Sequence, residues 1–439
     1  MVILIKVVQL LLSLSILVLF HEFGHFITAR IFKTRVEKFY MFFDPWFSLF
    51  KFKKGDTEYG IGWLPLGGYC KISGMIDESM DKEQMKLPPQ PWEFRSKPAW
   101  QRLIIMLGGV TVNILLAIGI YICILSYWGD KYLPTSAVKY GISVNALGKE
   151  IGLQNGDQIL SVDNKEVEEF SSIQKQIILN QAKTIQITRD GQKMNISIPT
   201  GFVSKVIKAN SLDFISFRYP FEADKFVLGS AAEKAGMKLN DRIIGINDSL
   251  FPYFEEFSAA LQRYKNKNVK LIVVRAGDTL KLPVTIPASG KIGVYRKDLS
   301  AYFDLKVKSY NIITAVPAAF TMTFEKTGDY LKSLKLLFKQ EKAYESVGGF
   351  ISIGSLFPDA WDWLTFWTWT AFLSIMLAVI NVLPIPALDG GHVMFLLYEI
   401  IFRRKPSDKF MEYAQITGMI ILFGILIFAN LNDVLKLFR

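Results

Sequence analysis

The sequence predicts a polytopic α-helical membrane protein with four transmembrane helices, a membrane-reentrant β-sheet and two inserted α+β domains. Hydrophobic residues make up 51% of the 439 residues, and the mean hydropathy of +0.26 lies well above that of a typical soluble domain. Four apolar segments, at about 2–29, 102–127, 364–384 and 413–431, are each near the roughly 20 residues that a bilayer requires. The long segment between the second and the third carries strand and turn patterns instead.

The charge of the chain indicates a membrane rather than nucleic acid as its partner. The net charge is +11 and the pI is near 9.3, but the basic residues lie close to the apolar segments, and we find no zinc-finger or RNA-binding motif. We therefore expect the lipid bilayer as a partner, no nucleic acid and no obligate partner chain. Cys70 and Cys123 fall in a loop and in a predicted span, so we expect no disulfide.

Basic residues also orient the spans. The residues that follow the first span are Arg30, Lys33, Arg35, Lys38, Lys51, Lys53 and Lys54. Those that precede the second span are Arg95, Lys97 and Arg102, and those between the third and the fourth are Arg403, Arg404, Lys405 and Lys409. The positive-inside rule then puts both short loops in the cytoplasm, and both termini and segment 129–360 on the other side. The first apolar run is too long for a signal peptide and lacks a cleavage site, so we expect it to remain as a span.

The first span carries His21, Glu22 and His25 in the pattern H-E-x-x-H. On a helix the two histidines lie one turn apart on one face and can bind one cation, and Glu22 is placed to polarise a water on it. Burying three ionisable groups in lipid is expensive, which favours a functional site over a chance match on a core helix. Because the histidines lie in the C-terminal half of the span, the metal is expected nearer the cytoplasmic side.

Two histidines do not complete a zinc site, so a third protein ligand is required. His392 is one candidate and Asp389 is a better one. Pro384 and Pro386 break the third span just before Asp389, and a carboxylate on a broken helix inside a membrane has few uses besides binding a cation. Asp389 could also cap the helix that follows it, and both roles could hold together.

Residues 36–74 read as β-structure. Residues 47–52 alternate, residues 54–56 form a turn, and Pro65 with the following glycines breaks the next run. A hairpin this apolar, placed between two spans, is expected to fold into the membrane beside the metal, where protein or a wet cavity has to satisfy its edges. A cytoplasmic surface hairpin is the alternative. Residues 77–97 read as an exposed linker.

The middle of the chain contains an internal repeat. Residues 151–159 (IGLQNGDQI) recur, shifted by 84 positions, as residues 235–243 (AGMKLNDRI). Each copy leads into a strand, a turn, a helix-like stretch and alternating strands, so we expect two small α+β modules of the same fold. The shared pattern resembles PDZ domains, which can add a peptide strand to an exposed sheet edge. Peptide binding and simple restriction of access to the membrane site remain equal alternatives.

The region after the modules indicates interfacial helices and then the last two spans. Residues 310–342 mix apolar and charged side chains, which is typical of amphipathic helices at a membrane interface. An aromatic belt marks the entry of the third span with Trp361, Trp363, Trp367 and Trp369. The predicted domains are 1–128, 129–205, 206–300, 301–363 and 364–439.

The motif HEFGH in the first span, NVLPIPALDGG after the third, and the PDZ-like pair between them resemble the site-2 protease family of intramembrane zinc metalloproteases. The resemblance covers essentially the whole chain and is closest to the bacterial regulator-of-sigma-E type with tandem PDZ domains. It implies one Zn²⁺ per chain bound by His21, His25 and Asp389, with Glu22 as the catalytic base.

The resemblance also implies a substrate class and further site residues. Asn113, in a stretch similar to the family's G-P-x-x-N motif, and Asn381 would contact substrate or orient the site, and Pro384 would lie beside the substrate. Substrates would be single-span membrane proteins already cut outside the membrane, either anti-sigma factors or signal-peptide remnants. The chain would be a multi-pass protein of the inner membrane with its PDZ-like domains in the periplasm. Residues 42–45 read Phe-Phe-Asp-Pro where the family has a glycine-rich motif.

The expected reaction is metal-assisted peptide hydrolysis within the bilayer, with Glu22 passing a proton from water to the leaving amine. Two other functions use the same residues differently. A metal transporter would conduct ions and give Glu22 no special role, since polar residues in spans also mark ion pathways. A PDZ scaffold with a structural zinc would bind peptides without Glu22. A His-His-carboxylate set also suits Fe(II), but the glutamate beside the first histidine favours hydrolysis.

Overall fold

The computed structural model describes all residues except 1, 66, 76–86, 210, 340–346 and 439. The chain divides into two compact units. One unit holds the chain up to Gly129 together with the helices after Ser309, and the other is Asp130–Lys308.

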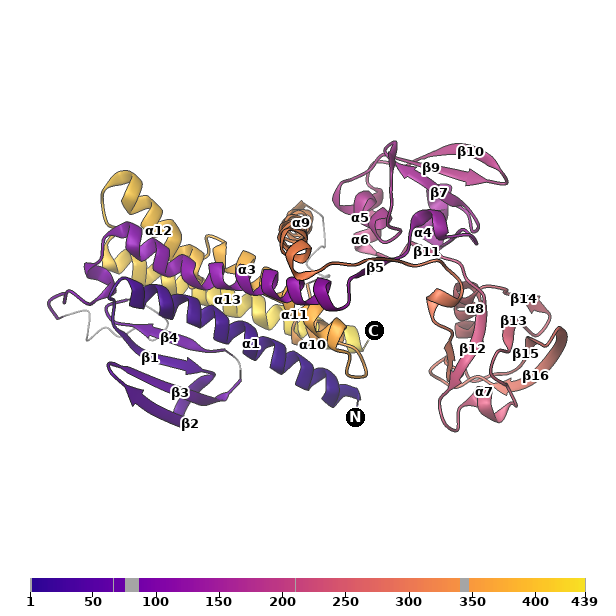
Figure 1. Cartoon of the computed structure of the whole chain (residues 1–439), viewed down its shortest axis with the longest axis horizontal. Helices are drawn as coiled ribbons and strands as arrows, with labels where there is room; N and C mark the ends of the chain where they lie inside the picture. The colour runs from indigo at the N-terminus through magenta and orange to yellow at the C-terminus, as the bar shows by residue number, and fades with distance from the viewer. Residues whose placement is uncertain (1, 66, 76–86, 210, 340–346, 439) are drawn as a thin grey trace. The chain divides into compact units, whose positions relative to one another are not determined.

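Among the described residues of the first unit, four helices are long and apolar enough to cross a membrane. These are α1 (Val2–Ile31), α3 (Ala99–Tyr127), α11 (Trp363–Val382) and α13 (Asp408–Leu437). All four predicted spans are therefore confirmed as apolar helices, and the fourth is longer than predicted. The two ends of the chain lie at the same end of this bundle (Figure 1).

Glycines allow α1 and α3 to pack closely. A Cβ atom on Gly24 would lie 2.3 Å from the Gly108 carbonyl oxygen, and one on Gly108 would lie 2.5 Å from the Gly24 oxygen. Small residues are what bring helix backbones together in a membrane, where lipid supplies no hydrophobic drive. Helix α11 also packs on α3, through Ala371 and Ile375. The crossing holds the histidine-bearing turn of α1 against α3.

A four-stranded sheet follows the first span, as predicted. Its strands β1 (Val36–Met41), β2 (Phe43–Lys54), β3 (Thr57–Leu64) and β4 (Tyr69–Ile72) lie in the order β2-β3-β1-β4. The turn between β2 and β3 falls at Gly55, whose φ of +63° suits glycine. Strands β1 and β4 contact α1, and the sheet lies alongside that helix in Figure 1.

The segment before the second span is partly buried, so the prediction of an exposed linker is wrong for its C-terminal part. Phe94 in η1 (Phe94–Ser96) is 7% exposed and packs in a core with Val36 and Ile105. Its backbone N–H donates to the Ser73 carbonyl. The apolar ring and this backbone bond tie the segment to β4. Residues 77–86 of the predicted linker lie outside the described residues.

The second unit contains two modules with separate hydrophobic cores. The first has β5 (Asp130–Tyr132), β6 (Ile142–Val144), α4 (Ala146–Glu150), β7 (Gln158–Val162), β8 (Lys165–Glu166), α5 (Ser172–Leu179), β9 (Thr184–Arg189), β10 (Gln192–Ser197), α6 (Phe202–Lys208) and β11 (Ile215–Phe217). The second has β12 (Phe221–Phe226), α7 (Ala231–Lys234), β13 (Arg242–Ile246), β14 (Ser249–Leu250), α8 (Phe254–Leu261), β15 (Asn268–Arg275), β16 (Asp278–Thr285) and β17 (Val294–Arg296), and β18 (Lys306–Lys308) follows.

The two modules repeat the same ion pair, which supports the prediction that they have the same fold. Asp157 accepts two hydrogen bonds from Arg189, at 2.7 and 2.8 Å. Asp241 accepts two from Arg275, at 2.7 and 2.6 Å. In both copies the arginine also donates to the carbonyl of the glycine in the repeated motif. Bidentate arginine–carboxylate pairs of this kind fix the relative orientation of the two side chains and also stabilise the fold.

The predicted boundary between residues 205 and 206 falls inside the first core. Val206, Phe214 and Ile215 belong to that core, and β11 pairs with β6 from the start of the module. The pairing of β18 with β5 likewise carries the unit on to Lys308 rather than to residue 300. A strand that returns to pair with the start of its module leaves no mark in the neighbouring sequence. Boundaries drawn from the internal repeat alone therefore fall too early.

The described part of the first unit has three more α-helices: α9 (Ile312–Lys339), α10 (Phe350–Ser355) and α12 (Asp389–Phe402). The predicted amphipathic segment forms the single helix α9, which runs across α3 and α11 rather than along them (Figure 1). It buries Ala315 and Ala319 against these helices, while Ile313 and Phe324 are exposed.

We predict that Asp241→Ala weakens the second module alone. The carboxylate is fully buried, so its loss leaves Arg275 without its partner and costs about 2–4 kcal/mol. Hydrogen exchange on the whole protein should then be faster in β13 and β15 and unchanged in β7 and β9. Asp248→Ala is the control, since that side chain is 95% exposed. Unchanged exchange in the Asp241 variant would contradict the assignment.

The pH dependence of the same pair has a definite sign. Burial alone raises the pKa of Asp241, but hydrogen bonds from Arg275 and the Lys238 N–H outweigh burial and lower the pKa below its ordinary 3.8. A lowered folded-state pKa contributes stability that is present above about 3.8 and is lost as the pH falls toward the folded-state value. Acid should therefore reduce the difference in exchange between the wild-type protein and the Asp241 variant.

Candidate metal centre

The H-E-x-x-H turn lies on α1 where that helix crosses α3. His21 and His25 are 9% and 7% exposed, and their Nε2 atoms are 3.4 Å apart. One helical turn separates the two residues, so their rings share a face of α1, as the spacing predicts. Gly109 of α3 lies directly opposite, because a Cβ there would come within 2.5 Å of His25 Nε2 and 2.6 Å of the His21 ring.

The third span breaks where the prolines predict. Helix α11 ends at Val382 and α12 begins at Asp389, with Pro384 and Pro386 between them. A Cβ on Gly390 would lie 2.1 Å from the Leu383 carbonyl oxygen, so only glycine allows this tight return of the chain. The N-cap of α12 is Leu388, so the Asp389 side chain is not used as the helix cap.

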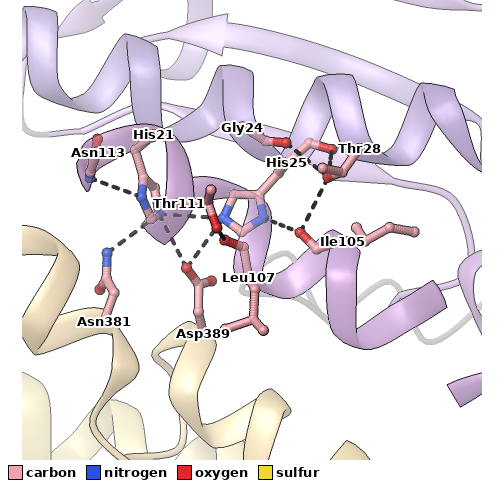
Figure 2. Close-up of polar contacts among 10 residues, drawn as sticks. All are labelled: His21, Gly24, His25, Thr28, Ile105, Leu107, Thr111, Asn113, Asn381 and Asp389. Carbon is pink, nitrogen blue, oxygen red and sulfur yellow. Dashed lines mark hydrogen bonds and ion pairs between the residues drawn. The ribbon is translucent and has the colours of Figure 1, made fainter. Parts of the chain in front are cut away.

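The break brings Asp389 to the two histidines (Figure 2). Its Oδ2 atom lies 3.3 Å from His21 Nε2 and 3.3 Å from His25 Nε2. Two ligands of a tetrahedral zinc ion, each about 2.0–2.1 Å from the metal, are about 3.3–3.4 Å apart. The three measured separations therefore match three corners of a zinc tetrahedron, and the fourth corner would be left for water or substrate.

The chemistry of the three atoms supports a cation at their centre. Within the described residues, Asp389 Oδ2 is a buried oxygen with no hydrogen-bond partner, and the same three residues form the one group of histidines, cysteines and carboxylates close enough to share a metal. Three lone pairs facing one point inside an apolar bundle repel one another unless a cation lies between them. The residues present therefore fit zinc.

The far side of each imidazole faces a polar group of α3, and such groups orient metal-bound histidines. His25 Nδ1 lies 3.0 Å from the Ile105 carbonyl oxygen of α3. His21 Nδ1 lies 3.2 Å from the side-chain nitrogen Nδ2 of Asn113, which is fully buried. When Nε2 binds a metal, Nδ1 carries the proton and has to donate it, and the Asn113 amide accepts when its oxygen faces the ring. The position of Asn113 therefore fits orientation of the site, one of the two roles expected for it.

A cavity of about 530 Å³ opens beside the three residues. It is lined by His21, Glu22 and His25 from α1, by β4, and by Asn381 and the loop before α12. The Asn381 amide nitrogen lies 3.4 Å from His21 Nε2. Glu22 accepts a hydrogen bond from the backbone N–H of Cys70 in β4. The cavity thus joins the candidate ligands, the candidate base and one strand of the sheet.

Two further residues that the sequence singled out, His392 and Pro384, are not part of the group of three. His392 also lines the cavity, but the group that can share one cation contains Asp389 in its place. Pro384 is exposed and does not line the cavity, so its position fits the breaking of the third span better than a substrate contact. Sequence reasoning missed Gln415 of α13, which lines the cavity and is 4% exposed. Its one signal is a glutamine inside an apolar span.

A helical membrane protein with such a buried His-His-Asp set and a glutamate beside it belongs, as a class, with metal-dependent membrane peptidases. Peptidase family M50 matches residues 9–425, and the chain belongs to that family. "Protease RseP" of Yersinia pestis is 27% identical over 97% of this chain and 98% of its own. "Regulator of sigma E protease" of Haemophilus influenzae is 26% identical, with the same coverage. "Putative zinc metalloprotease" of Treponema pallidum is 26% identical over 99% of this chain and 100% of its own.

These relationships decide between the functions that the sequence left open. The chain is a membrane-embedded zinc metalloprotease. A metal transporter and a PDZ scaffold with a structural zinc are therefore excluded as its main activity. The expectation of zinc as the cofactor and of a protease of the site-2 family is confirmed.

We predict that Gly109→Ala lowers the zinc affinity of the protein at least about tenfold, because the new Cβ displaces both imidazoles from the positions that match a tetrahedron. Competition with a chromogenic chelator measures the affinity. Gly119→Ala is the matched control, because Gly119 lies on the same helix and has no atom within 4 Å of the added Cβ. Equal zinc affinity in the Gly109 variant and the wild-type protein would show that the ions bind elsewhere.

Proposed function

We propose that this protein is an intramembrane zinc metalloendopeptidase that cleaves the transmembrane segments of single-span membrane proteins. In this proposal His21, His25 and Asp389 bind zinc, and Glu22 is the general base. The observation that carries it is the convergence of the two imidazoles and the carboxylate at 3.3–3.4 Å, inside an apolar bundle.

When bound, zinc supplies a Lewis acid that polarises a peptide carbonyl and acidifies water. Glu22 follows His21 directly in the chain and lines the same cavity without belonging to the group of three ligands. It takes the proton of the attacking water and passes it to the leaving amine. The Asn381 amide, beside His21 in the cavity wall, donates to the substrate backbone or to the developing oxyanion.

The sheet supplies a place for an extended substrate. A helical substrate hides its carbonyls in its own hydrogen bonds, so it has to unwind before cleavage. Strand β4 lies at an edge of the sheet and lines the cavity through Tyr69, Cys70 and Lys71. An unwound segment can add to this edge as a further strand and place its peptide bond beside Glu22. Substrates with helix-weakening residues in their spans are therefore expected to be cut best.

The other edge of the sheet has the surface expected of a membrane-reentrant element. In β2 the side chains of Trp46, Phe47, Leu49 and Phe50 are 90%, 55%, 65% and 58% exposed. Contiguous exposed apolar residues of this size are rare on a water-facing surface and are typical of contact with lipid or another protein. The sheet contacts α1, an apolar span, through β1 and β4. This attachment favours lipid as the partner, and the sheet then carries β4 to membrane depth.

The two modules are proposed as PDZ-like domains with different tasks. In the first, Gln174 of α5 donates to the Ile215 carbonyl of β11, a backbone group that an added peptide strand would use. In the second, β17 is an edge strand preceded by Gly293 with φ of +77°. We infer that the first module restricts access to the membrane site, while the second retains an edge that can accept a peptide. Substrates already trimmed outside the membrane would pass both modules and reach the metal centre.

Charge and the position of the chain ends in the bundle support one orientation. Both termini lie at one end of the bundle (Figure 1), and the basic loops at Arg30–Arg35 and Arg403–Lys405 belong to the other end. We propose that the basic end faces the cytoplasm, so the modules and both termini of this inner-membrane protein lie outside it. The metal centre then lies nearer the cytoplasmic side. The resemblance to the regulator-of-sigma-E type favours anti-sigma factors or signal-peptide remnants as substrates.

We predict that Glu22→Gln reduces cleavage about 10²–10⁴-fold, the usual contribution of a general base, while zinc stays bound. The assay reconstitutes the purified protein with a tagged single-span model substrate that carries glycine and asparagine in its span, and follows the fragments by gel. Zinc content is measured on the same samples. Chelation should stop cleavage by the wild-type protein, and added zinc should restore it.

Asp359→Asn is the matched control for this substitution. Asp359 pairs with Lys6, in the first turns of α1 and well away from the histidines, and its side chain is 73% exposed. This variant should cleave at the wild-type rate. Full cleavage by the Glu22 variant would end the proposed role of Glu22, and cleavage outside the span of the model substrate would end the intramembrane assignment.

A further inference from the structure

The fourth span contacts the rest of the first unit at few points. Among the described residues of α13, the buried ones are Gln415, Gly418, Ala429 and Asp433. The last two lie near α10, and Asp433 accepts hydrogen bonds from that segment. The first two lie one turn apart near the start of the span, and both face the loop between α11 and α12 that carries the metal centre.

Gly418 allows the closest contact between α13 and this loop. A Cβ there would lie 1.8 Å from the Pro386 carbonyl oxygen, a separation that no side chain can occupy. One turn earlier, the Gln415 Oε1 accepts a hydrogen bond of 3.1 Å from the backbone N–H of Ala387. Gln415 is 4% exposed. The span therefore reaches the loop with one backbone contact and one side-chain hydrogen bond.

Ala387 is a residue that needs such support. Its φ of +78° lies in the left-handed region, which alanine adopts at a cost. Its N–H lies in an apolar bundle, where an unpaired donor is unfavourable. Gln415 satisfies this N–H in the conformation that the structure shows. Since Asp389 follows two residues later, the same bond determines where the carboxylate can lie.

We propose that Gln415 is a positioning residue for the metal centre: through Ala387 it holds the loop so that the Asp389 carboxylate stays within reach of both imidazoles. The proposal rests on the assignment of His21, His25 and Asp389 as zinc ligands. It makes α13 a part of the metal centre, although the span supplies no ligand.

A merely structural glutamine would stabilise the bundle whether or not zinc is present. A positioning residue instead affects zinc affinity more than the stability of the zinc-free protein. It also acts through the backbone conformation of Ala387. A glycine at position 387 adopts a positive φ without strain and should therefore compensate in part for the loss of the hydrogen bond.

The test substitutes Gln415 by methionine, which keeps the length and apolar volume of the side chain but removes the acceptor. On the full-length protein in detergent, chelator competition should show zinc binding at least about tenfold weaker than in the wild-type protein, the usual effect of losing a group that orients a ligand. The thermal unfolding of the zinc-free protein should change little. Thr417→Ala is the control, because its hydroxyl donates to the Tyr413 carbonyl of its own helix. It should bind zinc as the wild-type protein does.

The double variant Gln415→Met with Ala387→Gly should recover a measurable part of the lost affinity. Wild-type affinity in the Gln415 variant, or a loss that glycine does not reduce, overturns the proposal. If the methionine variant does not fold, Gln415→Asn, which is one methylene too short to reach Ala387, is measured in the same way. Absence of zinc from the wild-type protein would instead contradict the ligand assignment itself.

Discussion

The meeting of two imidazoles and one carboxylate inside hydrocarbon is the constraint on which the rest of this structure depends. Such groups are costly to bury, and at 3.3–3.4 Å from one another they are compatible with each other when a cation lies between them. Helix α1 has to approach α3 closely enough for the Ile105 carbonyl to reach one ring. Helix α11 has to break so that its chain can return. The glycines at the α1–α3 crossing and the prolines after Val382 serve these two requirements.

Two further parts of the first unit fit what a peptidase in a membrane needs. A helical substrate has to be unwound, and β4 brings an open strand edge to the cavity that contains Glu22. The span α13 lies beside the site but has few buried residues, and these lie toward its two ends. We propose that the modules in the second unit act before the membrane step, because none of their described residues belongs to the group of three that can share a metal.

The sequence predicts the local parts of this arrangement well and the distant contacts poorly. The spacing of His21 and His25 puts them on one face of a helix whatever the rest of the chain does, and the prolines identify Asp389 because a carboxylate in an apolar run demands an explanation. The repeat is likewise readable, and the aligned pair Asp163 and Asn247 accept equivalent backbone hydrogen bonds in the two modules. The sequence gives no sign of the role of Gln415, because its partner Ala387 lies in a distant loop that meets α13 only in the folded protein. The return of β11 to β6 was missed for the same kind of reason.

X-ray absorption at the zinc edge of the purified, full-length protein tests the convergence of the three side chains most directly. The expected spectrum shows two imidazole ligands and two oxygen ligands, all at about 2.0–2.2 Å. In the Asp389→Ala variant, both imidazoles should remain and the affinity should fall. A sulfur ligand, which Cys70 in the cavity wall could provide, or fewer than two imidazoles in the wild-type spectrum would contradict a centre made by His21, His25 and Asp389.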